Sequence, residues 1–137
     1  MLNANNLPVL LVESDEIEVL TMQRAMQENS IANPLIVCKS GDQGLKQLNN
    51  SFQTPKLILL DIKADAFTFL DKVKRDPKLR RVPIVLLTSS VSDQTKCIKQ
   101  NVNAAGYMVK PNLYNGYKQM VNAIRTYWSL SQLPQTA

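Results

Sequence analysis

The sequence predicts an α/β fold, a doubly wound five-stranded parallel sheet with helices on both of its faces. Two observations predict it. Five short runs are hydrophobic at nearly every position, which is typical of strands buried on both faces in parallel sheets. A segment with apolar residues at helical spacing follows each run, and alternating strands and helices form the right-handed crossovers of a doubly wound sheet.

The five expected strands are the apolar runs 8–12, 34–38, 56–60, 82–88 and 105–109. Pro83 is compatible with a strand because it lies near the start, where a missing backbone donor is tolerated. The five expected helices are 15–28, 40–50, 66–76, 92–102 and 113–130. Asp15 and Glu18 resemble a capping box, so the first helix is expected to begin at Ser14 or Asp15. Ser92 is the expected N-cap of the fourth helix.

The composition limits the class of protein. A length of 137 residues fits one domain, expected over 1–137 with its core at about 7–130. The net charge of +5 is mild, and its densest group, within 72–81, contains no aromatic residue, so we expect no nucleic-acid partner. No apolar run is long enough to span a bilayer and no signal-peptide core follows Met1, so we expect a cytoplasmic protein with no membrane partner.

The histidine and cysteine content limits metal chemistry. The sequence has no histidine, and Cys38 and Cys97 cannot form a zinc site alone. Both cysteines lie in apolar or helical surroundings, which favours buried thiols in a reducing compartment.

Polar residues follow the strands at their carboxyl ends, the edge where doubly wound folds bind ligands. Glu13 and Ser14 follow the first strand, Asp61 follows the third, Thr88 ends the fourth and Lys110 follows the fifth. A carboxylate can accept a phosphoryl group, and a divalent cation together with a lysine would neutralise the charge of that group. Oxygen ligands beside a phosphate favour Mg²⁺.

Four motifs, each at the end of its own strand, resemble those of the receiver domain of two-component response regulators: LLVES, LILLD, IVLLTSS and GYMVKP. The resemblance covers essentially the whole chain and implies the (βα)5 flavodoxin-like receiver fold. It implies that Asp61 is the phosphoacceptor, Thr88 the switch hydroxyl and Lys110 the phosphate-binding lysine. Tyr107 is the implied switch aromatic.

The same resemblance implies a function. The chain would be a stand-alone response regulator in a phosphorelay, accepting a phosphoryl group from a histidine kinase on Asp61. It would catalyse this transfer to itself and would not be a turnover enzyme. The ending TYWSLSQLP resembles single-domain regulators that partner cyanobacterial phytochromes, so a phytochrome-type kinase is expected, and no output domain is expected to follow.

The resemblance also implies a homodimer. The expected interface is formed by the helix at 92–102, the strand at 105–109 and the helix at 113–130. The last helix has more aromatic residues than one layer of contacts is expected to bury. They are Tyr114, Tyr117, Tyr127 and Trp128.

Two departures from the family pattern concern the metal. Receivers usually have two adjacent acids after the first strand, whereas here Ser14 follows Glu13. A neutral hydroxyl is a poor Mg²⁺ ligand, so Ser14 is expected to be a weak or absent ligand and Mg²⁺ to bind weakly. The loop DIKADAF after the third strand is shorter than usual. The expected ligands are Glu13, Asp61 and the backbone carbonyl of Lys63, with Asp65 as a possible substitute.

These departures favour an alternative, a pseudo-receiver that signals by binding partners without phosphorylation. A flavodoxin-like nucleotide or flavin protein is a weaker alternative, because the acidic stretch ESDEIE would repel phosphate after the first strand. Single residues also have simpler interpretations. Asp61 could cap the next helix, Thr88 could end a strand, Lys110 could be a turn lysine and Tyr107 a core aromatic.

Overall fold

Five parallel strands form one sheet in the order β2-β1-β3-β4-β5, which confirms the predicted fold class. The structure is a computed structural model and describes residues 6–133, apart from 52 and 64. The strands are β1 (Val9–Val12), β2 (Leu35–Cys38), β3 (Leu57–Asp61), β4 (Ile84–Thr88) and β5 (Gly106–Val109). The helices are α1 (Glu16–Glu28), α2 (Gly41–Asn50), α3 (Ala66–Arg75), α4 (Val91–Lys99) and α5 (Tyr114–Tyr127).

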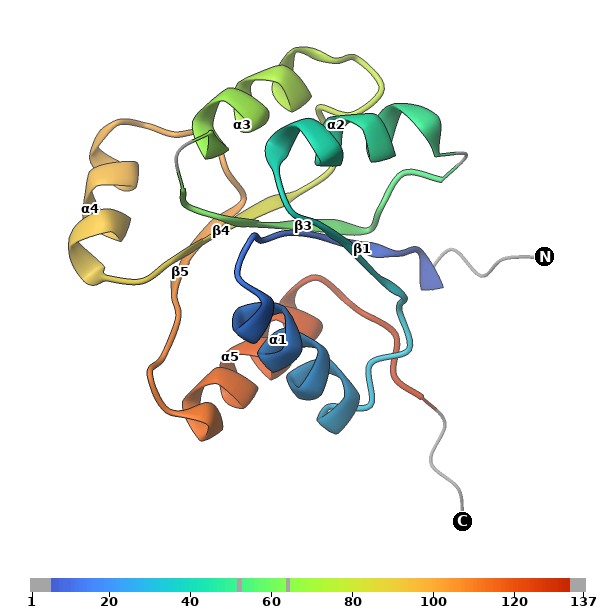
Figure 1. The fold of residues 1–137 in the computed structure, drawn as a ribbon, viewed down its shortest axis with the longest axis vertical. Helices are drawn as coiled ribbons and strands as arrows, with labels where there is room; N and C mark the ends of the chain where they lie inside the picture. Colours follow the sequence, from blue (N-terminus) through green and yellow to red (C-terminus); the bar gives the residue numbers. More distant parts are fainter. Residues whose placement is uncertain (1–5, 52, 64, 134–137) are drawn as a thin grey trace.

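The helices cover both faces of the sheet, as Figure 1 shows: α1 and α5 lie on one side, and α2, α3 and α4 on the other. Each face has its own hydrophobic core. Met22 and Ile124 belong to the core beneath α1 and α5, and Phe69 and Leu48 belong to the opposite core. Within the described part of the chain, no helix is both long and apolar enough to cross a bilayer.

The three central strands are buried at every position, which is why their sequences are continuously apolar. Asp61 is the last residue of β3 and pairs in register with Leu87 of β4. The strand therefore extends one residue beyond the predicted run and carries its carboxylate at the edge of the sheet.

Two glycines allow α2 to approach α3 closely. A Cβ atom on Gly44 would lie 2.9 Å from Cε2 of Phe69, and one on Gly41 would lie 3.1 Å from the Phe69 Cβ. Phe69 is 1% exposed. The small residues of α2 therefore leave the space that this aromatic ring fills.

Helix α4 begins earlier than its sequence predicts, and the prediction that Ser92 is its N-cap is wrong. Ser90 has an extended backbone, and its Oγ accepts a hydrogen bond from the Asp93 amide at 3.1 Å. The helix ends before Asn101, whose φ of 53° is left-handed. Of its residues, all of them described, only Cys97 is buried.

The aromatic residues of α5 and its cap are used mostly inside the chain. Tyr117 is buried in the core, and the Tyr114 hydroxyl donates to Oε1 of Glu28 on α1 at 2.6 Å. Trp128 packs against β5, where a Cβ on Gly106 would lie 3.2 Å from its ring. Tyr127 alone of the four is exposed, at 76%. The aromatic argument for a dimer is therefore weaker than the sequence indicates.

Candidate functional site

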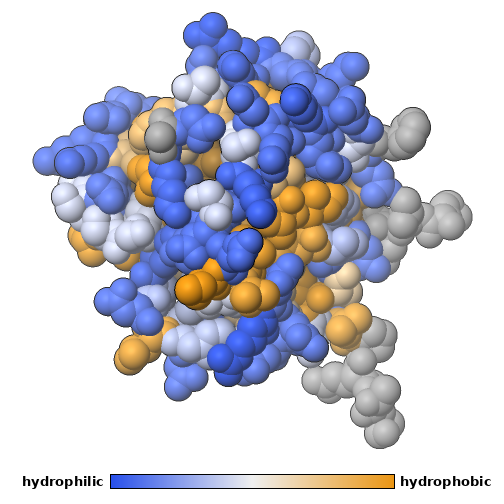
Figure 2. Space-filling model, viewed as in Figure 1, coloured by the Kyte–Doolittle hydropathy of each residue, from blue (hydrophilic) through white to orange (hydrophobic). Residues whose placement is uncertain are grey.

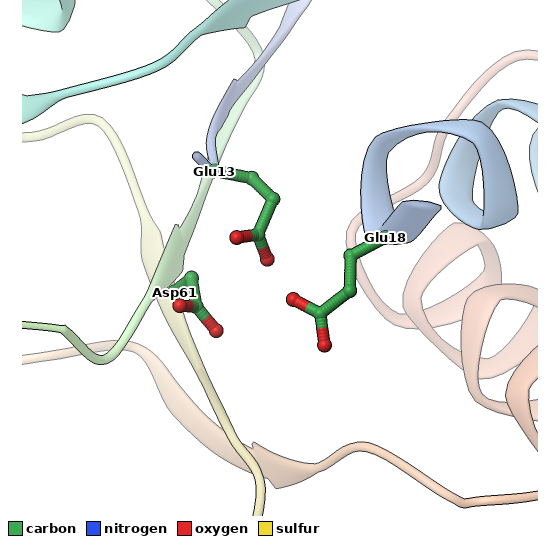
Figure 3. A group of neighbouring side chains, drawn as sticks. All are labelled: Glu13, Glu18 and Asp61. Atoms are coloured by element: carbon green, nitrogen blue, oxygen red, sulfur yellow. The ribbon is translucent and has the colours of Figure 1, made fainter. Parts of the chain in front are cut away.

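Three carboxylates and two ammonium groups meet at the carboxyl end of the sheet. Glu13 follows β1, Asp61 ends β3 and Lys110 follows β5. Glu18 comes from the first turn of α1 and Lys63 from the loop after β3. Figure 3 shows the three carboxylates pointing toward one shared space.

Asp61 and Lys110 form the buried centre of the site. The Lys110 Nζ lies 2.7 Å from Oδ1 of Asp61, and the two residues are 8% and 5% exposed. The backbone amide of Lys110 donates to the carbonyl of Thr88 at 2.8 Å, which joins the start of the β5–α5 loop to β4. The strand ends therefore hold both charged groups in place.

Glu18 is the site residue that sequence reasoning missed. Asp15 caps α1 by accepting from the amides of Ile17 and Glu18, but Glu18 does not complete the predicted capping box. Its carboxylate turns to Lys110 instead, with Oε1 and Oε2 at 2.7 and 2.8 Å from Nζ. The amide of Asp15 donates to Glu13 Oε2 at 3.2 Å. One sequence signal could have identified Glu18: it lies in the first turn of α1, shortly after the acidic end of β1, and that turn lies over the edge of the sheet.

Lys63 contributes its side chain, where the sequence predicts a role for its backbone. Its Nζ lies 3.1 Å from Oε2 of Glu13 and 3.3 Å from Oδ2 of Asp61. Its carbonyl accepts a hydrogen bond from the amide of Ala66 at 2.9 Å and so takes part in the turn that begins α3. The ammonium group therefore lies where the prediction places a carbonyl and a metal.

Ser14 and Asp65 lie outside the carboxylate group. Both residues are exposed. The Asp65 carboxylate lies over the start of α2, with Oδ2 3.2 Å from where a Cβ on Gly41 would be. The structure thus places Glu18 beside Glu13 and Asp61, where the sequence suggests Asp65 as the substitute.

Thr88 and Tyr107 face away from the carboxylates in this structure. Thr88 is fully buried, and its Oγ1 donates to the carbonyls of Ser90 and Met108 at 3.2 and 3.4 Å. The Tyr107 hydroxyl donates to the carbonyl of Val102, and the ring packs against the core beside α4. Their switch roles stay predictions.

The oxygen atoms of the site suit a hard divalent cation. Glu13, Glu18 and Asp61 each offer a carboxylate oxygen within 4.8 Å of the others. Oδ2 of Asp61 is buried and accepts no hydrogen bond from any described residue, although Lys63 lies 3.3 Å away. Carboxylates at this spacing are ligands that Mg²⁺ and Mn²⁺ accept. The donor set therefore fits the metal that the fold implies.

The charges of the site are nearly balanced without a metal. When all groups are ionised, three carboxylates face two ammonium groups. Burial raises the pKa of Glu13 to about 7, and neighbouring Glu18 and Asp61 add to the rise. Although burial lowers it, hydrogen bonds with Asp61 and Glu18 hold the pKa of Lys110 above its usual range. Lys110 is therefore charged at neutral pH, whereas Glu13 is poised between its two states.

Glu13→Gln is expected to abolish a loss of stability that the wild type shows as pH rises. An acid whose pKa is higher in the folded chain than in the unfolded one destabilises the fold progressively, here between about pH 4.5 and 7. The amide resembles the protonated acid. At pH 8 the variant's free energy of unfolding should exceed the wild-type value by at most about 3 kcal/mol, and at pH 4 the two should match. Urea unfolding at both pH values, with a chelator present, measures this. An equal difference at both would contradict the assignment.

Comparison with known proteins finds relatives among regulatory proteins. No family model matches the chain. It is 29% identical over 129 residues to the probable methanogenesis regulatory protein FilR2 of Methanothrix harundinacea, covering 88% of this chain and 82% of that protein. It is 27% identical to response regulator Rcp1 of Synechocystis, covering 88% and 87%.

Solved structures agree. The Mn(2+)-bound form of Rcp1 matches with a TM-score of 0.76 and 26% identity, covering 96% of this chain and 99% of that one. The bacteriophytochrome response regulator RtBRR matches with a TM-score of 0.79 and 28% identity, covering 96% and 82%. In fold, in the residues of its site and in sequence, the chain is similar to the receiver domains of two-component response regulators. Within that class it is similar to single-domain regulators such as Rcp1 and RtBRR.

Proposed function

We propose that the chain is a response regulator receiver that accepts a phosphoryl group from a histidine kinase on Asp61. The observation that carries this proposal is the state of the Asp61 carboxylate at the mouth of the sheet. Its Oδ2 accepts no hydrogen bond from any residue between 6 and 133 that the structure describes, while Lys110 holds Oδ1 at 2.7 Å. Lys110 thus orients one oxygen, and the other, which lies 3.3 Å from the half-exposed ammonium group of Lys63, is the proposed nucleophile.

The proposed step is a displacement at phosphorus. Asp61 Oδ2 attacks, a P–O bond forms, and the P–N bond of the donor phosphohistidine breaks, with its electron pair staying on the imidazole nitrogen. Lys110 remains beside the new acyl phosphate and offsets its charge. A bound Mg²⁺ would supply further neutralisation of the phosphoryl oxygens. The protein modifies itself in this scheme and does not turn over substrate.

We infer that the donor is a histidine kinase of the phytochrome type, because the chain is similar to the bacteriophytochrome response regulators RtBRR and AtBRR. The surface beside the site supports a protein donor. Ile17 and Leu20 of α1 are 75% and 64% exposed, and Leu20 lines the same hollow as Glu13. Figure 2 shows hydrophobic surface near the start of α1, interrupted by hydrophilic residues.

The direct test uses a small phosphodonor and Mg²⁺, with intact mass as the readout. A gain of one phosphoryl group supports the receiver function. The gain is expected to be slow, because Ser14 supplies no carboxylate and the site already holds two lysines. No gain at saturating Mg²⁺ would refute phosphoryl acceptance.

Specific observations keep the pseudo-receiver as a second candidate. Lys63 and Lys110 already compensate most of the site's negative charge, and Thr88 is hydrogen-bonded away from Asp61. A module that only binds partners would need no more than this. Partner binding that persists while no phosphoryl gain occurs would select this candidate.

Self-association through α4, β5 and α5 is expected at high protein concentration. Val91 and Ile98 of α4 and Tyr127 of α5 are exposed, at 66%, 53% and 76%, and apolar side chains of this kind favour burial between copies. Sedimentation velocity measures the effect. Ile98→Asp should shift the protein toward monomer, whereas Leu20→Asp on α1 should not. A monomer at all concentrations would contradict the expected dimer.

A further inference from the structure

Lys63 enters the carboxylate group from solvent. Its side chain is 49% exposed, whereas Glu13 and Asp61, which its Nζ contacts at 3.1 and 3.3 Å, are each 3% exposed at the side chain. Glu18 Oε2 lies 4.0 Å from the same nitrogen. The long, half-exposed side chain of Lys63 therefore brings a positive charge to all three carboxylates.

Lys110 contacts the same carboxylates but is fixed in place. Its side chain is 6% exposed, and hydrogen bonds to Asp61 and to both oxygens of Glu18 hold it at 2.7–2.8 Å. Lys63 has longer contacts and an open path to solvent. Of the two ammonium groups, Lys63 is the one that can leave without exposing buried surface.

The charge balance of the site indicates that Lys63 occupies the place of a divalent cation. With Lys63 withdrawn, the three carboxylates and Lys110 keep two uncompensated negative charges, the number that a divalent cation neutralises. With both Lys63 and a divalent cation in place, positive charges would repel one another in a largely buried site. The two cations therefore exclude each other.

We propose that a divalent cation binds among Glu13, Glu18 and Asp61 by displacing the ammonium group of Lys63. Glu18 supplies the carboxylate that position 14 lacks. The inference rests on the proposed function, which requires a metal near Asp61, and it adds both the third ligand and the competing group. Lys63 sets how much cation is needed before the site becomes competent.

The surroundings offer the displaced lysine a new position. Lys63 also lines a neighbouring cleft of about 330 Å³ between α3 and α4, together with Asp93. Moving there would keep the ammonium group near a carboxylate while it leaves Glu13 and Asp61. The backbone turn at Lys63 need not change, because the carbonyl of Lys63 can keep its hydrogen bond from the amide of Ala66.

The test measures binding of the metal alone, with Mn²⁺ followed by loss of its free electron paramagnetic resonance signal and Mg²⁺ by competition. Lys63→Met removes the charge and keeps the length, and it should tighten binding about tenfold. Glu18→Gln should weaken binding at least about tenfold. Lys39→Met is the matched control, because Lys39 lines the cleft over Glu13 and Asp61 but pairs with the exposed Glu16 at 3.7 Å. It should change affinity little.

The measured affinities show whether the cation displaces the ammonium group of Lys63. Equal affinity of wild type and Lys63→Met overturns displacement, and equal affinity of wild type and Glu18→Gln overturns the ligand role. Absence of binding in every variant overturns the whole inference. A thermal unfolding scan of each variant without metal shows whether it is folded. Failure of the proposed function is distinct: the affinity ratios would hold while the phosphodonor assay gave no gain in mass.

Discussion

Asp61→Asn should abolish phosphoryl acceptance completely. The amide has the same shape as the carboxylate but lacks the anionic oxygen that attacks phosphorus. Packing at the end of β3 should survive, because Asp61 is surrounded by Leu60, Leu87 and polar groups that an amide also tolerates. The measurement is intact mass after incubation with a small phosphodonor and Mg²⁺, where the wild type gains one phosphoryl group and the variant gains none.

The matched control is Asp65→Asn. Asp65 is four residues further along the same loop and helix start, but its exposed carboxylate lies by Gly41, away from Lys110. This variant should be modified like the wild type. Modification of Asp61→Asn, or its loss in Asp65→Asn alone, would move the acceptor to another residue.

Lys110→Met should destabilise the fold by about 3 kcal/mol at pH 7 and also prevent phosphoryl acceptance. Removing one partner of a buried ion pair leaves carboxylates without compensation, which typically costs about 3–5 kcal/mol. The lower end applies here because Lys63 remains beside Asp61 and Glu18 is 32% exposed. Urea unfolding measures the first effect, and intact mass after phosphodonor treatment measures the second.

The pH dependence separates this effect from a packing defect. The raised pKa of Lys110 means that its stabilisation is complete at neutral pH and is lost only as pH rises through that pKa. Burial raises the pKa of Glu18, but hydrogen bonds with Glu13 and Lys110 outweigh it and lower the pKa overall. The deficit should therefore shrink below about pH 4.5. Lys39→Met, at an exposed pair, should cost less than about 1 kcal/mol. A deficit that does not depend on pH would indicate lost packing.

The fold could be predicted from the sequence because its signals are local and redundant. Continuous apolar runs, each followed by a helical pattern, leave few topologies once crossovers are right-handed. The errors occurred at the ends of elements. At α4, two serines two residues apart could each cap the helix, and only the extended backbone of Ser90 decides between them. The place where β4 ends in the sheet determines which of the two serines caps the helix.

The site could be predicted only where a residue directly follows a strand. Asp61 and Lys110 lie together because parallel strands end at one edge. Glu18 and Lys63 reach the site through long side chains from a helix and a loop, and sequence spacing does not fix the direction of such side chains. The capping pattern at Asp15 and Glu18 fitted a local role equally well, so the choice depended on the distant Lys110.

Helix α4 buries a single side chain against the sheet, and that side chain is the thiol of Cys97. Cys97 is 1% exposed, and burial raises its pKa, as burial also does for Cys38 at the end of β2. Only a thiolate reached by solvent reacts with an alkylating reagent, so modification of Cys97 requires local opening of α4. Modification of Cys38 requires opening near β2, at the opposite edge of the sheet. The two labelling rates give separate opening free energies within one molecule. The protein thus contains its own reporters of whether a change at Asp61 loosens or tightens α4, without any introduced probe.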